Sequence, residues 1–474
     1  MRSSNGRHPV AVVGAGPAGL AAAAALRERG VPVAIYDAGK PLSERDHAAA
    51  DDLGLGVGGA GLFSDGKFSF YPSGTQLYRL ANRRRLLRAY ARSTDWLNAV
   101  GIPSESLPGD YRGHTRTPGS ACKHYPSYYG SLAQRRELVD ALSDGLHEDL
   151  HTHTHVRAVD LTGATPTIDV EHGDSGHMVR HDVSGVVLAS GRFGGLDIRE
   201  RRVRSSLHLR PQRVEIGIRI ESPNPVGFLE RSRSADVKRI WSGAGAQIRT
   251  FCTCRNGEIW HIPLAGLSAL SGRSDGPPTA FSNFGLLARF SGTRLPMGLS
   301  MWEAARREAL AQPTAIFEPL GDFLHPRGGP NGGSSATRRD LVAGRPWFPK
   351  DAFHRGSIRQ RAGDLLHSIL REAVLELLRA SPDLANPEAM CLFPAVEGVG
   401  FYPTAGESLR VARERVWCAG DVVGRFRGLV PGLVSGYYAG SAAADSLRRD
   451  RVVVSLAASR GPREPATIQP GTDA

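Results

Sequence analysis

The segment VAVVGAGPAG at Val10–Gly19 constrains the fold of this 474-residue chain more than any other. It has the pattern of a buried strand, a glycine-rich turn and the start of a helix. Gly14 is expected to make the tight bend, Gly16 to let the backbone lie against a pyrophosphate, and Gly19 to let the helix pack close to the strand. The next apolar run ends in Asp37, at the spacing of an acid that accepts hydrogen bonds from a ribose. The segment predicts a Rossmann-like unit that binds a dinucleotide.

The helix predicted after this turn covers residues 17–29. Its first N–H groups and the positive end of its dipole are expected to face the phosphates. The whole turn should therefore line the cofactor: Gly14, Ala15, Gly16, Pro17, Ala18 and Gly19.

The net charge of +12 invites a nucleic-acid interpretation, with arginine clusters at residues 83–85 and 199–204 as candidate phosphate contacts. Only five of the 59 basic residues are lysines, a bias typical of codon usage in a GC-rich genome. Charge alone indicates non-specific attraction. We therefore expect a small-molecule substrate and no nucleic-acid partner, although an anionic substrate or cofactor fits the charge.

Length and cysteine usage favour a cytoplasmic protein of two or three domains. The five cysteines, at 122, 252, 254, 391 and 418, are too scattered for a disulfide framework. The first residues run directly into the first strand, so we expect no signal peptide. The longest early apolar run, Ala18–Leu26, is too short to span a bilayer.

Two later segments fit the same nucleotide site. VVLASG at Val186–Gly191 is a strand with small residues at its carboxyl end, where ligands bind in open α/β sheets. VWCAGDVVG at Val416–Gly424 places Asp421 between a buried strand and a helix. An acid there can hold the sugar-alcohol chain of a flavin, and the next helix start can face the pyrimidine end of its ring. Together the three segments predict a flavin site.

Four motifs carry a resemblance that spans nearly the whole chain. They are GGAGLFSDGK (Gly58–Lys67), VEIGIRIESP (Val214–Pro223), RTFCTCRNGE (Arg249–Glu258) and AGDVVGRFRGLVPGLVSG (Ala419–Gly436). With them the chain resembles FAD-dependent oxidoreductases of the glutathione-reductase-type FAD fold. More narrowly, it resembles the NAD(FAD)-utilising dehydrogenase family.

The resemblance implies FAD as the cofactor and assigns residues to each part of it. The binding residues that it implies are Gly14, Gly16, Gly19, Asp37, Gly191 and Asp421, with Gly420 beside the last. It also implies ring contacts from Gly59, Ala60 and Gly61 and from Gly428, Leu429 and Val430, and an adenine contact from the Val156 backbone.

A second GxGxxG pattern at Gly56–Gly61 lacks a preceding strand, so it is interpreted as a loop beside the flavin. No other candidate for a nicotinamide domain is present. If NAD(P)H acts as a transient reductant, it is expected to visit the substrate cleft.

Candidate catalytic residues come from one region. Cys252 and Cys254 lie two apart in a predicted strand, so both thiols should face one side. They fit a redox pair, an acid near the flavin, or two buried small apolar residues. His261, in the sequence Trp260–Pro263, is expected on the substrate side of the flavin.

Two comparisons limit the reaction. The sequence Trp260–Pro263 keeps only the second half of the WxWxIP signature of flavin halogenases, with Glu258 at the first Trp position, which argues against halogenation. Class A hydroxylases carry Asp-Gly where this chain has Ser190 and Gly191, which weakens a hydroxylase interpretation.

Three histidines, His151, His153 and His155, are predicted on one face of a strand and invite a metal site. No cysteine or carboxylate completes a ligand set, so we expect an exposed ladder and no metal.

The predicted architecture is α/β. A Rossmann-like FAD-binding domain of the glutathione-reductase type is assembled from residues 1–204 and 391–455, a mixed α/β substrate domain is inserted at 205–390, and 456–474 is a disordered tail. Helices are expected at about 76–100, 131–150 and 365–378.

Three functions remain open. The first is a dehydrogenase or reductase that moves a hydride between FAD and a small organic substrate. The second is a single-component FAD-dependent monooxygenase that uses NAD(P)H and O2. The third, suggested by charge alone, is an RNA-modifying flavoprotein.

Overall fold

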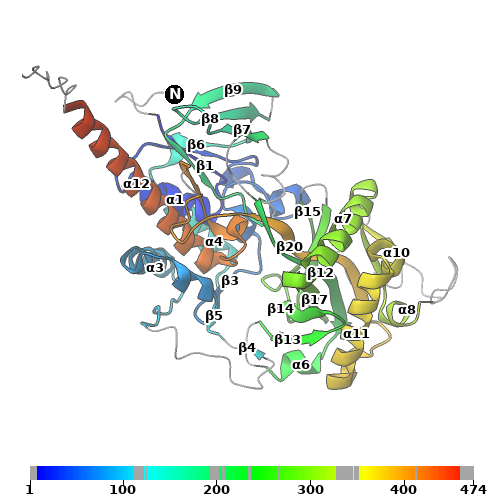
Figure 1. The fold of residues 1–474 in the computed structure, drawn as a ribbon. Coiled ribbons are helices and arrows are strands. Elements are labelled where there is room, and N and C mark those ends of the chain that lie inside the picture. The colour runs from blue at the N-terminus through cyan, green and yellow to red at the C-terminus, as the bar shows by residue number, and fades with distance from the viewer. Residues whose placement is uncertain are drawn as a thin grey trace, which may run out of the picture.

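The computed structural model describes residues 8–109, 122–123, 125–173, 175–192, 194, 202–204, 209–232, 236–264, 267–326, 345, 352–411 and 414–459. Figure 1 shows two parts side by side. One, the parallel-sheet part, contains β1 and the long helix α12. The other, the eight-stranded part, is built on a large sheet flanked by α7 and α11.

A five-stranded, fully parallel sheet forms the centre of the first part, in the order β21-β10-β1-β2-β6. Its strands are β1 (Val10–Val13), β2 (Val33–Tyr36), β6 (Leu150–His151), β10 (Gly185–Leu188) and β21 (Val416–Cys418). The side chains of β1, β2, β10 and β21 are buried throughout, as expected for parallel strands that are covered on both faces. The three strands predicted to carry the nucleotide site are thus neighbours.

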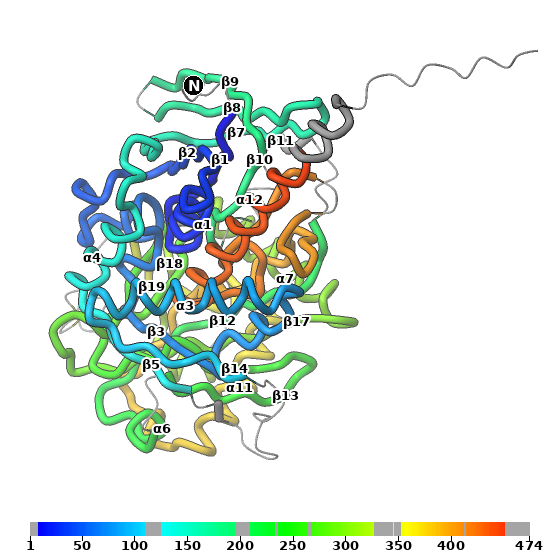
Figure 2. The backbone as a smooth tube through the Cα atoms, turned by 90° about the vertical axis from the view of Figure 1, so that its left-hand side faces the viewer, coloured from blue at the N-terminus to red at the C-terminus, as the bar shows by residue number. Residues whose placement is uncertain are grey.

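Helices α1 (Pro17–Arg27) and α12 (Leu429–Ser459) pack tightly against each other, side by side in both views (Figures 1 and 2). Glycines make this approach possible: a Cβ added at Gly436 would lie 2.1 Å from the Ala18 carbonyl oxygen, and one at Gly440 would lie 2.2 Å from the Ala22 oxygen. Helix α12 continues to Ser459, so the first four residues of the predicted tail are helical, and residues 460–474 lie outside the described part.

A four-stranded sheet, β11-β7-β8-β9, contributes to the same apolar core. Its strands are β7 (Thr154–Asp160), β8 (Thr167–His172), β9 (His177–Asp182) and β11 (Arg202–Arg204). Two helices, α3 (Arg83–Ala99) and α4 (Leu132–Ser143), complete this part. The predicted helix at 76–100 is interrupted, because the Asn82 side chain accepts a hydrogen bond from the Arg85 N–H and starts a new helix there.

Short elements connect these larger ones. They are η1 (Leu42–Glu44), η2 (Ala50–Leu53), α2 (Gly59–Leu62), β3 (Lys67–Ser69), η3 (Thr75–Arg79), β4 (Cys122–Lys123), β5 (Ser127–Tyr129) and η4 (His147–Asp149).

The second part contains an eight-stranded sheet in the order β19-β18-β20-β12-β17-β14-β13-β4. Seven of its strands come from this part of the sequence: β12 (Leu209–Pro223), β13 (Lys238–Gly243), β14 (Ala246–Cys254), β17 (Phe281–Ser291), β18 (Ala315–Pro319), β19 (Phe353–Arg355) and β20 (Met390–Pro403). A hairpin of β15 (Glu258–Leu264) and β16 (Leu267–Arg273) lies beside it. Strand β20 pairs with β12 and β18, so residues 391–403 lie in this sheet, although the predicted boundary joins them to the FAD-binding domain.

Helices cover one face of this sheet. They are α6 (Gly227–Glu230), α7 (Leu295–Ala311), α8 (Leu320–Leu324), α10 (Ile358–Ala362) and α11 (Asp364–Ala380), with the 3-10 turns η5 (Gly292–Arg294), η6 (Pro382–Leu384) and η7 (Gly420–Val423) elsewhere. The helix predicted at 365–378 is confirmed as α11, whose apolar stripe is buried.

The residues of β12 show which face of the eight-stranded sheet packs against the helices. Val214, Ile216, Ile218 and Ile220 belong to the apolar core under the helices. The alternating residues include Glu215, Arg219 and Glu221, which are charged and fully buried. Because alternate side chains of a strand point to opposite faces, these charges lie on the face away from the helices.

Candidate active site and cofactor site

The glycine-rich turn has the geometry that its sequence predicts. Gly14 has a φ of +102°, and its N–H donates to the Tyr36 carbonyl oxygen at 2.8 Å. A Cβ at Gly14 would lie 2.7 Å from the Ala189 oxygen, and one at Gly19 would lie 1.8 Å from the Gly14 oxygen. Side chains at either position would separate the turn, the helix and β10.

Asp37 ties three backbone segments together at the end of β2. One carboxylate oxygen accepts the Ala15 N–H at 2.7 Å, and the other accepts the N–H groups of Gly39 and Gly56 at 2.9 Å each. A carboxylate has about four acceptor positions, so one remains for a ribose hydroxyl. Thr154, at the start of β7, donates its N–H to the Asp37 carbonyl oxygen at 2.9 Å. Val156, the predicted adenine contact, is buried two residues further along β7.

The loop with the second GxGxxG pattern lies directly against the first turn. The Gly58 N–H donates to the Ala15 oxygen at 2.9 Å. A Cβ on Gly59 would lie 2.9 Å from the Gly16 Cα, and one on Gly61 would lie 2.5 Å from Leu429 Cδ2. The sequence-based interpretation of a loop beside the cofactor, preceded by η2 and not by a strand, agrees with this placement.

Arg45 holds this loop and was not anticipated from the sequence. Its buried guanidinium donates to the carbonyl oxygens of Val57 at 2.7 Å and Gly59 at 3.0 Å, and to that of Asp52. Burial lowers the pKa of Arg45 to about 10, against the opposing effect of Asp37 and Asp52. A single arginine in an irregular segment has no periodic pattern that would reveal its role.

The third segment reaches the same place from the end of β21. Gly420 has a φ of +74°, and a Cβ there would lie 2.8 Å from the Ala18 Cβ at the start of α1. Asp421 follows, and Gly428, with a φ of +95°, leads into Leu429 and Val430 at the start of α12.

The residues present fit a flavin dinucleotide. The glycine positions form a cradle that Cβ atoms would fill, and Gly191, at the end of β10, has a φ of +73° with open space at its Cβ position. Beside it the Ser190 hydroxyl is buried and makes no hydrogen bond within the described residues. The structure thus brings together all three predicted segments at the carboxyl edge of the parallel sheet.

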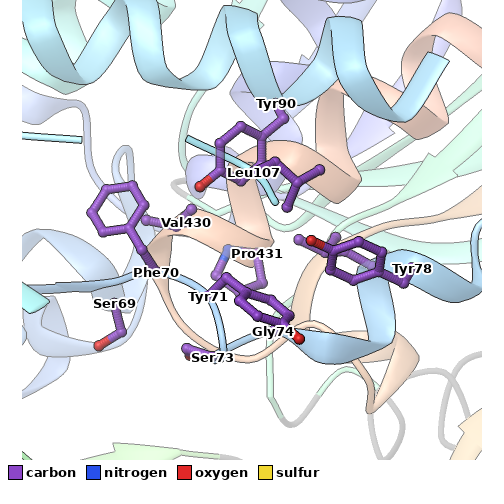
Figure 3. Close-up of a pocket in the computed structure, with 11 residues that line it drawn as sticks. Ser69, Phe70, Tyr71, Ser73, Gly74, Tyr78, Tyr90, Leu107, Val430 and Pro431 are labelled. Carbon is purple, nitrogen blue, oxygen red and sulfur yellow. The ribbon is translucent and has the colours of Figure 1, made fainter. Parts of the chain in front are cut away.

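A small pocket adjoins the start of α12 (Figure 3). Val430 and Pro431 line it together with the aromatic side chains of Phe70, Tyr71, Tyr78 and Tyr90. The pocket offers an apolar, ring-lined surface next to the predicted flavin contacts.

An arginine cluster joins the two parts of the molecule. Glu215, fully buried on β12, accepts hydrogen bonds from Arg249 at 2.8 Å and Arg427 at 2.7 Å, with Arg289 bound to its other oxygen and Arg213 at 3.4 Å. Glu397 on β20 binds Arg427 at 2.6 Å and also Arg249.

The same cluster reaches the cofactor site through Asp421, which lies 3.2 Å from Arg427 and 3.5 Å from Arg192. Five guanidinium groups thus face three carboxylates, an excess of two positive charges. Burial raises the pKa of Glu397, but Arg427, Arg249 and Arg192 outweigh it and hold the pKa at about 2. These ionised groups concentrate positive potential beside the predicted ring site.

The two predicted catalytic cysteines do meet, although not by regular strand alternation. Cys252 has a φ of +45° within a β-bulge, and its sulfur, the Cys254 sulfur and an Asp65 oxygen all lie within 4.8 Å of one another. Asp65 belongs to the loop that continues from Gly61.

His261 lies where the β15 hairpin contacts both parts of the molecule, between Asp51 of η2 and Phe353 of β19. Its neighbours Trp260 and Ile262 pack against the core of the parallel-sheet part, whereas the His261 ring lies 6.2 Å from the Phe353 ring. Burial lowers the pKa of His261, with Asp51 opposing, so the imidazole is neutral at pH 7.

The three predicted histidines do not form one ladder. His151 ends β6 and stacks on Tyr36 at 5.2 Å, His153 lies in a turn with a φ of +52°, and His155 is in β7. The chain changes from one sheet to another between them, which a strand prediction across 153–161 does not reveal. Within the described ranges, the one group of residues that could hold a metal contains none of them.

A comparison with known protein families identifies the cofactor. Residues 9–211 match the family described as FAD binding domain. This part of the chain is similar to FAD-binding domains. The match confirms FAD as the predicted cofactor and supports the predicted class, an FAD-dependent oxidoreductase.

Several solved structures are similar to this chain over most of its length. The flavin-dependent halogenase CmlS is 13% identical, with 96% of this chain and 60% of that chain covered and a TM-score of 0.42. The Mycobacterium smegmatis Sdh1 complex is 16% identical, with 98% and 73% covered and a TM-score of 0.39. The anhydrotetracycline hydroxylase OxyS from Streptomyces rimosus is 11% identical, with 96% and 66% covered and a TM-score of 0.41.

Similarity at this level says nothing about the substrate, and this chain spans only 60% of the length of the halogenase. No curated protein sequence matches the chain. Among the described residues, no helix is both long and apolar enough to cross a membrane.

Proposed function

We propose that the protein is an FAD-dependent dehydrogenase or reductase that transfers a hydride between the flavin and a small organic anion. The observation that carries this proposal is the arginine cluster, whose excess positive charge adjoins Asp421 and the start of α12. FAD, when bound, supplies the ring that accepts or donates the hydride.

The chain's own residues would hold FAD along the carboxyl edge of the parallel sheet. The turn at Gly14–Gly19 and the start of α1 would bind the pyrophosphate, and Asp37 would bind the adenosine ribose. Asp421 would hold the ribityl chain. Gly59–Gly61 and Gly428–Val430 would contact the ring from the two loops that meet at Leu429.

The charged face of the eight-stranded part would bind the substrate. Arg192 is the most accessible member of the arginine cluster, with 39% of its side chain exposed. Guanidinium groups bind carboxylates through paired, charge-assisted hydrogen bonds. A small organic acid is therefore the substrate class that the cluster favours.

We also propose a family and a division into domains. We place the chain in the NAD(FAD)-utilising dehydrogenase family, with a glutathione-reductase-type FAD domain and an inserted substrate domain. We put the end of the insertion after Pro403, because β20 pairs inside the eight-stranded sheet. A cytoplasmic location is expected from the sequence.

The first test is whether the protein binds flavin. Purified or FAD-reconstituted protein should be yellow, and anaerobic addition of the right small organic acid should bleach the flavin absorbance. Arg192→Gln should raise the KM for that acid about tenfold while FAD binding is retained, since one charged hydrogen bond is lost. Arg180→Gln, on the distant strand β9, serves as the matched control.

Other outcomes would contradict this proposal. Rapid flavin reduction by NAD(P)H with substrate-stimulated O2 uptake would indicate the monooxygenase. RNA binding that persists at moderate salt would indicate the RNA-modifying flavoprotein. A protein that stays colourless after reconstitution, and in which Gly16→Val changes nothing, would refute the cofactor site itself.

A further inference from the structure

A second reactive group lies beside Asp65, four residues along the chain from the predicted ring contact Gly61. Cys252 and Cys254, near the end of β14, have sulfur atoms within 4.8 Å of each other and of an Asp65 carboxylate oxygen. Cys254 is fully buried and Cys252 is half-buried. Both are reduced in this structure.

A β-bulge brings the two sulfurs together. Phe251 pairs with Gly285, and Cys254 pairs with Asn283, so β14 carries one extra residue against its neighbour. Cys252 is the extra residue and adopts a left-handed backbone conformation, with a φ of +45°, which is unfavourable for a non-glycine residue. Alternate residues of a regular strand lie about 7 Å apart, at the upper limit for a disulfide, and a bulge shortens that separation.

The charges around the sulfurs favour a thiolate. Arg219 is fully buried, and it donates to the Cys252 carbonyl oxygen at 2.7 Å and to the Cys254 sulfur at 3.5 Å. No ion pair joins Arg219 to a carboxylate in the part of the chain that the structure describes, because the nearby Glu221 pairs with Arg345. Lys67, paired with Asp65 at 3.1 Å, adds a second buried cation.

The two cations, Arg219 and Lys67, favour a thiolate over a metal ion at this site. Two sulfurs and a carboxylate are a possible metal-ligand set, but a metal ion would have to lie beside a guanidinium and an ammonium group, whose charges repel it. The same cations stabilise the thiolate that starts a thiol–disulfide reaction.

The Cys252 thiol is the one suited to be ionised. A hydrogen bond from Cys254 lowers its pKa to about 7, against burial, and Arg219 lowers it further. The pKa of Cys254 is held well above its ordinary value by the hydrogen bond to Cys252 and by burial.

One continuous loop connects this pair to the cofactor. Gly61 lies against Leu429 and Pro17 in the FAD site. Four residues later, an Asp65 carboxylate oxygen lies 4.0 Å from the Cys252 sulfur.

We infer that Cys252 and Cys254 form a redox-active dithiol–disulfide pair that exchanges two electrons with FAD. The inference rests on the proposed flavin function. In the oxidising direction, the thiolate of Cys252 and the thiol of Cys254 form one S–S bond and release two electrons and one proton. FAD takes up both electrons and a proton and becomes FADH⁻, so the charges and atoms balance. The reverse reaction reduces the disulfide.

Counting electrons tests the pair directly. The FAD-loaded, mildly oxidised protein should take up about four electrons per flavin in an anaerobic dithionite titration, two for each two-electron couple. Cys252→Ser and Cys254→Ser should each lower this to about two. Cys391→Ala, a buried cysteine on β20, should keep four and is the matched control.

Thiol alkylation gives a readout that needs no turnover. Mass spectrometry should find Cys252 and Cys254 protected in the oxidised protein and alkylated after reduction. A yellow protein that takes up only two electrons, with both thiols alkylated throughout, would overturn the inference and leave the proposed function standing. A protein that binds no flavin would overturn both.

Discussion

At the scale of single residues, two kinds of position determine the packing and the stability of this molecule. Glycines such as Gly14 and Gly19 permit backbone approaches that any side chain would block. Buried charged groups such as Asp37 and Glu318 have their energetics set by a few specific partners. The two buried acids, Asp37 and Glu318, each lead to a prediction.

Replacing Asp37 with Ala should weaken FAD binding at least tenfold. The substitution leaves three N–H groups, those of Ala15, Gly39 and Gly56, without their acceptor, at a cost of about 1–3 kcal/mol for each one that stays buried. Fluorescence titration of the apoprotein with FAD measures the change. Asp51→Ala, an exposed acid in the neighbouring segment, should bind FAD like the wild type.

Glu318 should make the protein less stable as the pH rises. Burial, the largest effect, raises its pKa to about 7, above the ordinary value of an unfolded chain. The protonated side chain therefore contributes its full stability below about pH 4, and that contribution is lost as the pH rises through 7.

Glu318→Gln removes this dependence, and the Gln side-chain oxygen can still accept the Ile358 N–H, which lies 2.9 Å from the Glu318 carboxylate. The variant should gain up to about 3 kcal/mol relative to wild type between pH 5 and pH 8. Urea unfolding at the two pH values measures the gain. An equal difference at both would contradict the prediction.

At the scale of elements, the close packing of α1 and α12 determines where the FAD site lies. Both helices begin at the carboxyl edge of the sheet, one after the glycine-rich turn and the other after Gly428. Their contact depends on Gly436 and Gly440, which have no side chain and therefore let the two helix backbones approach each other directly. The pair therefore holds the two ends of the cofactor site at a fixed separation.

Gly436→Ala should force these helices apart. Its Cβ would lie 2.1 Å from the Ala18 oxygen, far inside van der Waals contact, and overpacking of this kind costs about 1–3 kcal/mol. Gly432→Ala, in the same helix but with no atom within 4 Å of its Cβ, should be neutral or stabilise the helix by up to about 1 kcal/mol. Thermal unfolding of the apoproteins compares them. Equal melting temperatures would contradict this account.

At the scale of the whole molecule, the arginine cluster links the parallel-sheet part to the eight-stranded part. Arg427 precedes α12 in the parallel-sheet part, and it forms ion pairs with Glu215 and Glu397 on two strands of the sheet. Removing one partner of such a network leaves buried charge without compensation, which is strongly destabilising.

Acid should weaken this link. The pKa of Glu397 is held at about 2, below its ordinary value, so its stabilising contribution is present above about pH 4.5 and is lost as the pH falls through 2. Glu397→Gln should therefore destabilise the protein by up to about 3 kcal/mol at pH 7 and by much less near pH 2.5. Denaturant titrations at both pH values measure the difference, with the exposed Glu388→Gln as control. A pH-independent loss would contradict the prediction.

Much of the cofactor site could be predicted because its signals are local. The bends at Gly14 and Gly420 and the acid at Asp37 depend on backbone conformation and chain direction over a few residues. The buried strands of the parallel sheet read directly as apolar runs. The match of residues 9–211 to the FAD binding domain agrees with that interpretation.

Other features have no local signal. The bulge at Cys252 depends on pairing with the distant strand β17, and Arg45 acts through carbonyl oxygens 7–14 residues away in an irregular segment. The interruption at Asn82 differs, because an asparagine N-cap is a local signal that the helix periodicity alone does not show. The alternation along β12 is visible in the sequence, but alternation alone does not tell which face packs under the helices. The predicted boundary grouped residues 391–403 with the FAD-binding domain, whereas β20 pairs with β12 and β18, because strand pairing is decided by partners far away in the chain.

By itself, therefore, the sequence determined a dinucleotide site, because glycine geometry and an apolar strand–helix pattern are encoded within single segments. Only the tertiary structure decided what surrounds that site. It placed five arginines from both parts of the molecule around three carboxylates, and it turned two cysteines of a bulged strand toward a loop of the cofactor site. Electrostatic energies depend on distance through space, and no spacing along the chain contains those distances.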